Sequence, residues 1–194
     1  MRHQIRIDLQ NALAVHELLL SDSALHMQLA ELAEWCLYAL RAGGKILFAG
    51  NGGSFADSQH LAAEFVSRLR FDRAPLPATA LGTNSSSMSA IGNDYGYDQI
   101  FARELRALAG PYDVFVPITT SGNSRNILAA VAVAKELAIR TMGFTGEAGG
   151  KLATVCPCLR VPSASTERIQ EGHILLGHIL CARVESAYFK GQIP

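Results

Sequence analysis

The chain has 194 residues, of which 49% are apolar and 18% are charged, and 17 basic and 17 acidic residues give a formal net charge of zero. This length suits one domain with a sizeable core. The balanced charge argues against nucleic acid or an anionic membrane surface as a partner. Because no signal peptide and no apolar run of membrane-spanning length is recognisable, we expect a cytoplasmic protein.

The four cysteines lack the CxxC spacing of common redox and zinc motifs. They are Cys36, Cys156, Cys158 and Cys181. We therefore expect reduced thiols, as is usual in the cytoplasm. Cys156 and Cys158 flank a proline, and alternate residues of one strand point to the same face. Two thiols without further ligands still make a poor metal site.

Two helices are expected at the start of the chain. Apolar residues recur at helical spacing over residues 1–20 and again over 24–40. The sequence Ser21-Asp22-Ser23 between them predicts a break and a helix cap. The second segment is apolar on nearly two faces, so we expect it to pack against both a sheet and another subunit.

A strand and a glycine-rich turn come next. The apolar run 45–49 is bounded by glycines and predicts a strand buried on both faces. In the turn 50–54, three glycines let the backbone take unusual angles and let a ligand approach it. This turn is not a dinucleotide-binding fingerprint, because Phe55 stands where the third glycine is needed. The segment 146–152 is not a P-loop either, because it is one residue short and ends on Leu152 instead of Ser or Thr.

The next segment, 55–68, predicts a helix that carries polar side chains along one face. Ser54 is the expected N-cap, and Asp57 lies near the positive end of the helix dipole. His60 and Glu64 are four residues apart, so an imidazole and a carboxylate share one face of the helix. The alternative interpretation is a surface pair on the helix with no chemical role.

The middle of the chain alternates short apolar and polar segments. We expect a strand at 78–81, a polar loop at 82–87 before a short helix, a polar turn at 92–97, a helix at 100–108 and a strand at 113–118. Pro117 cannot donate to a strand ladder, so it should lie at the end of the last strand or at a bulge.

A cluster of hydroxyl groups follows this third strand and leads into a helix at 125–137. Thr119, Thr120, Ser121 and Ser124 make up the cluster. Hydroxyls beside the free N–H groups of a helix N-terminus suit an anion, although the loop alone could be an ordinary cap. Since the turn 50–54 also follows a strand, both loops should open on the same edge of a parallel sheet. This shared position favours phosphate binding by the hydroxyl cluster.

The chain ends with a fourth strand at 140–145, a turn at 146–150, a fifth strand at 155–161 and a long helix at 166–188. The last helix carries Glu167, Gln170, His173 and His178. Strands that alternate with helices predict an α/β fold, in which a parallel sheet is covered by helices on both faces.

Five motifs stand in order along the chain. They are Gly50-Asn51-Gly52-Gly53-Ser54, Gln59-His60 with Glu64, Gly92-Asn93-Asp94, Ser121-Gly122-Asn123-Ser124, and Arg168-Ile169-Gln170-Glu171 followed by Gly177-His178. By these motifs the chain resembles the sugar isomerase (SIS) domain family over nearly its whole length. The resemblance implies a single domain over residues 1–194, with 1–42 as a helical N-terminal extension. It also implies a flavodoxin-like three-layer sandwich with a five-stranded parallel sheet, and a homotetramer whose active sites are shared between subunits.

The branch of this family that the chain is most similar to converts D-sedoheptulose 7-phosphate to D-glycero-D-manno-heptose 7-phosphate through an enediol intermediate. That reaction begins nucleotide-activated heptose synthesis for bacterial surface polysaccharides such as lipopolysaccharide. The resemblance implies one zinc ion per subunit, with His60, Glu64, Gln170 and His178 as ligands. It implies Glu64 and His178 as the acid–base pair. It places sugar-phosphate contacts at Asn51, Gly52, Gly53, Ser54, Glu64, Asn93, Asp94, Thr119, Thr120, Ser121, Ser124 and Gln170.

These residue types suit the implied chemistry. A carboxylate can abstract a carbon-bound proton, and an imidazole can shuttle a proton between two oxygens because its pKa lies near neutrality. Zinc accepts imidazole and oxygen ligands. Gln170 and His178 are eight residues apart, roughly 12 Å along a helix, so their convergence on one ion needs inward reach or two subunits. We expect His173 to be structural, and Asp57, Glu167 and Asp94 to support the ligands or the sugar hydroxyls.

Two other functions remain open from the sequence. Some members of the family sense sugar phosphates or act as adaptors for DNA-replication initiators, and such members typically lack the acid–base pair. The presence of Glu64 and His178 favours an enzyme over an adaptor. An isomerase of another ketose phosphate, such as a hexose or pentose phosphate, is the second alternative.

Overall fold

The computed structural model describes residues 1–190. In these residues six strands and seven α-helices follow one another along the chain. The elements are α1 (Arg2–Ser21), α2 (Ser23–Arg41), β1 (Ile46–Gly50), α3 (Gly53–Val66), β2 (Ala78–Ala80), α4 (Ser85–Tyr95), α5 (Ile100–Leu108), β3 (Val114–Ile118), α6 (Arg125–Glu136), β4 (Arg140–Thr141), β5 (Gly143–Gly146), β6 (Cys158–Val161) and α7 (Thr166–Tyr188). Short 3₁₀ turns occupy Tyr97–Gln99 and Leu152–Thr154.

The sheet is parallel throughout, and its strands lie in the order β2-β1-β3-β5-β6, with β4 also paired to β3. The chain winds outward from β1 in one direction and from β3 in the other. Ligands of such sheets bind at the carboxyl ends of the strands where the winding direction reverses. That point lies between β1 and β3, and the loops 50–54 and 119–124 follow these two strands.

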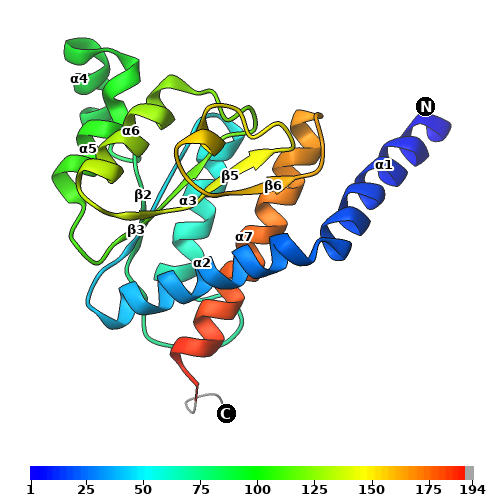
Figure 1. Cartoon of the computed structure of the whole chain (residues 1–194), viewed down its shortest axis with the longest axis horizontal. Helices are drawn as coiled ribbons and strands as arrows, with labels where there is room; N and C mark the ends of the chain where they lie inside the picture. The colour runs from blue at the N-terminus through cyan, green and yellow to red at the C-terminus, as the bar shows by residue number, and fades with distance from the viewer. Residues whose placement is uncertain (191–194) are drawn as a thin grey trace.

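Helices cover both faces of the sheet and make it the middle of three layers (Figure 1). Along β1, Ile46 and Phe48 belong to a core with α2, α3 and α7, whereas Leu47 and Ala49 belong to a second core with α5 and α6. Successive residues of a strand point to opposite faces, so the continuous apolar run supplies both cores. The predicted α/β class and the long final helix are confirmed.

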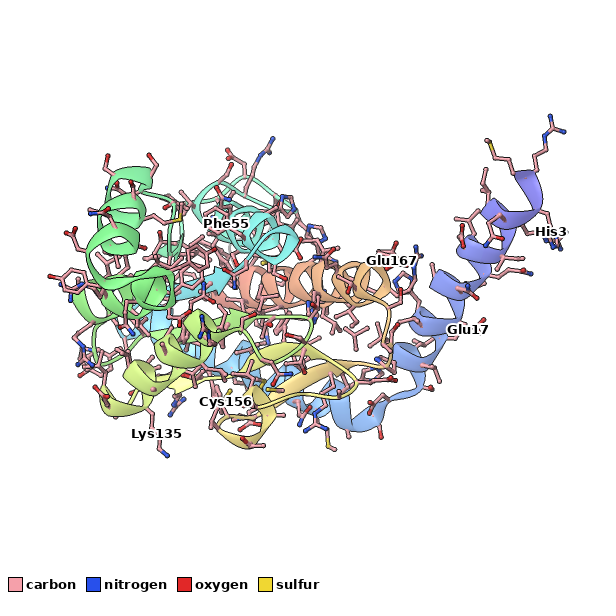
Figure 2. All side chains as sticks on the ribbon, turned by 90° about the horizontal axis from the view of Figure 1, so that it is seen from above. His3, Glu17, Phe55, Lys135, Cys156 and Glu167 are labelled. Atoms are coloured by element: carbon pink, nitrogen blue, oxygen red, sulfur yellow. The ribbon has the colours of Figure 1, made fainter. Side chains whose placement is uncertain are left out.

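The two leading helices form as expected, and Asp22 caps the second by accepting a hydrogen bond from the Leu25 N–H. α2 and the end of α1 join the core, but most of α1 stands away from the body (Figures 1 and 2). His3 and Glu17 mark this projecting helix in Figure 2. Among the described residues, no helix is long and apolar enough to cross a membrane.

Two predictions about helix ends are wrong. The N-cap of α3 is Gly52, at a φ of 55°, and Ser54 lies buried inside the first turn. Glycine takes this left-handed angle without steric cost, so the helix starts earlier than a serine cap would allow. The expected turn at 92–97 is instead helix up to Tyr95, because Asn84 caps α4 through the Ser87 N–H and Gly96, at a φ of 86°, ends it.

The fourth predicted strand is divided at Met142 into β4 and β5, so six strands occupy five positions in the sheet. β3 pairs with β4 up to Phe115 and with β5 again at Ile118. Pro117 falls in this gap, where its missing N–H removes a ladder bond, although it stays in register with β1. The fifth strand begins at Cys158 and not at Val155, because the 3₁₀ turn occupies the residues before it.

Candidate active site

The candidate site depends on two parallel helices, α3 and α7, that lie side by side on one face of the sheet (Figure 1). Gly53 lies beside Gln170, Leu61 beside Gly177 and His60 beside His178, so the paired residues are 116 to 118 positions apart in the sequence. The close approach occurs at Gly177, where a Cβ atom would collide with the buried Leu61. A side chain at this position would push the helices apart. The glycine therefore lets His60 and His178, which adjoin Leu61 and Gly177 in the sequence, lie close together.

At that level His60, Glu64 and His178 converge. The Nε2 atoms of His60 and His178 lie 2.8 Å apart, and the His60 Nε2 atom lies 3.3 Å from the nearest Glu64 oxygen. One potential ligand atom from each residue lies within 4.8 Å of the others. The His60 side chain is 48% exposed and the Glu64 side chain 16%, so the trio opens to solvent on the His60 side.

This donor set fits a zinc ion. Two imidazoles and one carboxylate are a known set for catalytic zinc, and they leave a fourth coordination position for water or substrate. Ligand atoms held about 2.0–2.1 Å from one ion must lie within a few ångströms of each other, as the trio does. The structure therefore supports a metal site of the His/Glu/His type.

Gln170 lies elsewhere on α7. Its amide contacts Gly53 at the start of α3, where a Cβ atom on residue 53 would collide with it. Gly53 precedes His60 by seven residues, about two helical turns or roughly 10 Å. Within the described chain, Gln170 is thus beside the glycine loop and a considerable distance from the trio.

Asp57 and His173 lie between the level of Gln170 and that of the trio. Among the described residues, Asp57 Oδ2 and both ring nitrogens of His173 are buried without a hydrogen-bond partner. Burial raises the pKa of Asp57, and a positive charge on His60 opposes this rise. Burial lowers the pKa of His173 to about 4 despite the nearby Thr145 carbonyl, so its imidazole is neutral at pH 7. A neutral, fully buried ring packed near Phe144 fits the structural role expected for His173.

The loop 119–124 holds its hydroxyl groups at the N-terminus of α6. Thr119 Oγ1 and Ser124 Oγ lie 3.1 Å apart, and Ser121 Oγ accepts the Asn123 N–H. Ser124 is the N-cap residue of α6, but its side chain makes no capping bond. The N–H groups of Arg125 and Asn126 at the start of α6 face this edge of the sheet without an intrahelical acceptor and suit an anion, whereas the Ile127 N–H donates to the Asn126 side chain.

The two loops are joined by Asn51 and by two residues that the sequence did not single out, Asn126 and Tyr97. The side-chain amides of Asn51 and Asn126 exchange two hydrogen bonds of 2.9 and 2.8 Å, and Asn126 is buried. The Tyr97 hydroxyl also donates to the Asn51 Oδ1 atom. This amide pair fixes the glycine loop relative to the hydroxyl loop. An asparagine in the first turn of a helix beside a candidate ligand loop was the only available signal, and Tyr97 gave none.

The remaining predicted residues are dispersed. Gly52 and Gly53 are exposed at the start of α3, whereas Ser54 is buried and its carbonyl accepts the Ser58 hydroxyl. Asn93 and Asp94 are exposed on α4, a helix with no buried residue, and hydrogen-bond each other. Glu167 is exposed in the first turn of α7, where the Ser165 hydroxyl lowers the pKa of its carboxyl group.

A doubly wound parallel sheet with the loops 50–54 and 119–124 at its switch point and a polar trio between α3 and α7 defines an α/β domain with a candidate catalytic centre. The SIS domain family matches residues 13–146, and the chain belongs to this family. Within it, the chain belongs with the phosphoheptose isomerases. It is 48% identical, over 99% of this chain and 98% of its relative, to the phosphoheptose isomerase of Aneurinibacillus thermoaerophilus.

Solved structures agree with this placement. The phosphoheptose isomerase of Neisseria gonorrhoeae superposes with a TM-score of 0.86 at 39% identity, covering 94% of this chain and 98% of that one. A phosphoheptose isomerase from Francisella tularensis superposes with a TM-score of 0.88 at 35% identity, covering 95% of this chain and 97% of that one.

Proposed function

We propose that this chain is an aldose–ketose isomerase that converts D-sedoheptulose 7-phosphate to D-glycero-D-manno-heptose 7-phosphate. The observation that carries the proposal is the convergence of His60, Glu64 and His178 between α3 and α7. The near full-length similarity to phosphoheptose isomerases supports the same reaction. The reaction would begin nucleotide-activated heptose synthesis in the cytoplasm, carried out by one SIS domain over residues 1–194 with 1–42 as its helical extension.

The proposed mechanism moves one proton between two carbons. Glu64 removes a proton from C1 of the ketose, which gives an enediol, and then returns a proton to C2. His178 takes the proton of the C1 hydroxyl and delivers it to the oxygen on C2, so that C1 becomes the aldehyde carbon. A zinc ion held by His60, Glu64 and His178 would polarise the carbonyl group and stabilise negative charge on the enediolate.

The two loops at the carboxyl edge are proposed to hold the sugar phosphate. Thr119, Thr120, Ser121 and Ser124 would bind the phosphate at the N-terminus of α6. Asn51, Gly52, Gly53 and Ser54 would contact the sugar, together with Asn93 and Asp94 from α4. The position of Gln170 beside Gly53 favours a substrate contact over a metal bond within one chain. A bond from Gln170 to zinc would need a rearrangement or a neighbouring subunit.

The direct test is incubation of the purified protein with sedoheptulose 7-phosphate, followed by detection of aldoheptose phosphate. Parallel incubations with ketohexose and ketopentose phosphates test the alternative of another sugar. An adaptor that only binds sugar phosphates should show affinity without turnover, and the paired Glu64 and His178 argue against that outcome.

The loop prediction concerns Ser121 and Ser124. Replacing both by Ala should raise the KM for the phosphorylated sugar by about tenfold for each hydrogen bond to the phosphate that is lost. Steady-state kinetics measures the change, with Thr141→Ala as a control because Thr141 pairs with the opposite, amino-terminal end of β3. An unchanged KM in the double variant would count against phosphate binding by this loop.

Zinc binding is expected to depend on His60. Elemental analysis of the purified protein should find about one zinc ion per chain, and His60→Ala should lose it. The control is His3→Ala, since His3 lies on the projecting α1 (Figure 2). Chelation should abolish turnover, and added zinc should restore it. Active protein without stoichiometric metal would contradict this assignment.

The apolar surface of the leading helices supports assembly into a homotetramer. Ile5, Leu9 and Leu13 form an exposed stripe along α1. A cavity of about 490 Å³ between α1, α2 and α7 is lined mainly by leucines. Exposed apolar patches of this kind mark association sites.

Light scattering should give four times the chain mass, and replacing the three stripe residues Ile5, Leu9 and Leu13 by Ser should lower the measured mass. A mass of one chain at micromolar concentration would exclude the tetramer.

A further inference from the structure

A pair of thiols lies outside the candidate active site, in the turn before β6. Pro157 separates Cys156 from Cys158, and the strand begins only at Cys158, so the two thiols are not arranged as alternate residues of one strand. The Cys158 thiol instead donates to the Cys156 carbonyl, at an Sγ–O distance of 3.5 Å. The Cys156 thiol also donates to the Leu152 carbonyl, at an Sγ–O distance of 3.7 Å.

Solvent and small solutes can approach the pair. Both cysteines line a cavity of about 290 Å³, together with Arg160 and residues of α2 such as Gln28. Cys156 is half-buried and lies at the outer margin of the body, on the yellow segment (Figure 2). Cys36 and Cys181, by contrast, are fully buried in the core. An oxidant in solution therefore reaches the paired thiols more easily than the other two.

The two thiols differ in acidity. The neighbouring Cys156 side chain lowers the pKa of the Cys158 thiol, and the guanidinium of Arg160 adds to this effect against the cost of burial. The Cys158 side chain, followed by burial, raises the pKa of Cys156. A thiolate is the reactive form of cysteine, so these directions favour Cys158 as the nucleophile of the pair and Cys156 as the neighbouring thiol.

The turn that carries the thiols supports the hydroxyl loop of the candidate active site. Cys156 N–H donates to the Leu152 carbonyl, and Leu152 N–H in turn donates to the Gly122 carbonyl at 2.9 Å. The Lys151 N–H also donates to the side chain of Asn123. Hydrogen bonds thus connect Cys156, through one 3₁₀ turn, to residues 122 and 123.

We infer that Cys156 and Cys158 are a redox-active pair that hydrogen peroxide converts to an intrachain disulfide, and that this disulfide loosens the loop 119–124. The Cys158 thiolate attacks one peroxide oxygen and breaks the O–O bond, which gives a sulfenic acid and, after protonation, water. The Cys156 sulfur then attacks the sulfenic sulfur, and the hydroxyl group leaves as a second water. The disulfide draws Cys156 Sγ away from the Leu152 carbonyl, and thiol–disulfide exchange with a reducing dithiol reverses the change.

The experiment uses differential alkylation and mass spectrometry of the intact protein treated with hydrogen peroxide. Trypsin cleaves after Lys151 and Arg160, so one peptide, residues 152–160, contains both thiols and no other cysteine. We expect this peptide to lose two hydrogens and both alkylation sites while Cys36 and Cys181 stay reduced. Treatment with a reducing dithiol should restore both alkylation sites of this peptide. Oxidation of all four cysteines together, or a sulfinic acid without a disulfide, would overturn the inference.

Two variants separate the roles of the sulfurs. In Cys156→Ser the sulfenic acid on Cys158 has no partner and should be trapped by dimedone. In Cys158→Ser the remaining Cys156 thiol should react slowly with hydrogen peroxide, since its pKa is not lowered. Little sulfenic acid should therefore form for dimedone to trap. Equal trapping in both variants would contradict the assignment of Cys158 as the nucleophile.

The link to the loop has a readout that needs no substrate. Amide hydrogen exchange of residues 119–124 should be faster in the oxidised protein than in the reduced protein, and equal rates would refute the link. The kinetic consequence rests on the proposed function: oxidation should raise the KM by about fivefold, the scale of one lost neutral hydrogen bond. If the reduced protein shows no turnover, the proposed function fails, whereas the thiol and exchange measurements still decide this inference.

Discussion

Glu64→Gln should lower turnover with the ketose phosphate by about 100-fold or more, the usual scale for losing a general base. The change is isosteric and keeps one oxygen that can face the metal ion, so zinc content, fold and assembly should survive. Substrate affinity should also persist, because the proposed phosphate contacts lie in the loop 119–124. The loss should therefore appear in kcat and not in KM.

The measurement is steady-state kinetics combined with deuterium exchange from solvent into the carbon next to the carbonyl group. Glu136→Gln is a matched control, since Glu136 is an exposed carboxylate on α6 that pairs with Arg106. His178→Gln should resemble Glu64→Gln, and the double variant should lose far less than the product of the single losses, because the two groups act together. If Glu64→Gln keeps both turnover and exchange, Glu64 is not the base.

Arg73→Met should destabilise the protein by about 3–5 kcal/mol, the cost of leaving one partner of a buried ion pair without its counter-charge. Arg73 Nε lies 3.0 Å from Glu185 Oε1, and the two side chains are only 2% and 1% exposed. Arg73 also donates to the carbonyls of Glu64 and Phe65 at the end of α3. Glu185 in turn accepts the N–H groups of Leu69 and Arg70.

Replacing both partners, as in Arg73→Met with Glu185→Leu, should recover only part of this loss. The lone buried charge is removed, but the backbone groups that the pair satisfied remain buried without partners. Thermal unfolding at fixed protein and zinc concentration measures the effect, with an expected fall of roughly 6–20 °C for the single variant. Arg70→Met is the control, because its side chain is exposed and its backbone N–H is kept. A full recovery in the double variant would contradict the capping role of the pair.

The positions of most elements could be predicted from the sequence because their signals are local. The apolar run at 45–49 has the length of a buried strand, and the helix periods at 100–108 and 166–188 match α5 and α7 in full. Errors occurred where a backbone angle or a cap decided the boundary. The start of α3 and the extent of α4 are of this kind, because glycine and asparagine each permit more than one outcome at such positions. The late start of β6 follows from the 3₁₀ turn that precedes it.

The candidate site was only partly predictable. The spacing of four residues places His60 and Glu64 together on any helix, so that pair needs no tertiary information. His178 joins them from 118 residues away, and Gln170 comes to rest two turns from them. Periodicity indicates which face of a helix is buried, but it does not indicate how far one helix slides along another. The contact of Gly177 with Leu61 sets that register.

By itself, the sequence determined the α/β class, the position of the two candidate ligand loops at one edge of a parallel sheet, and the polar pair on the helix after the first loop. These follow from residue spacing and from the rule that parallel strands end on the same edge. Only the tertiary structure decided that Asn126 and Tyr97 hold Asn51, that Arg73 and Glu185 close the end of α3, and that His178 lies opposite His60. Each of these contacts joins residues distant in sequence, and packing of buried side chains, not local spacing, brings them together.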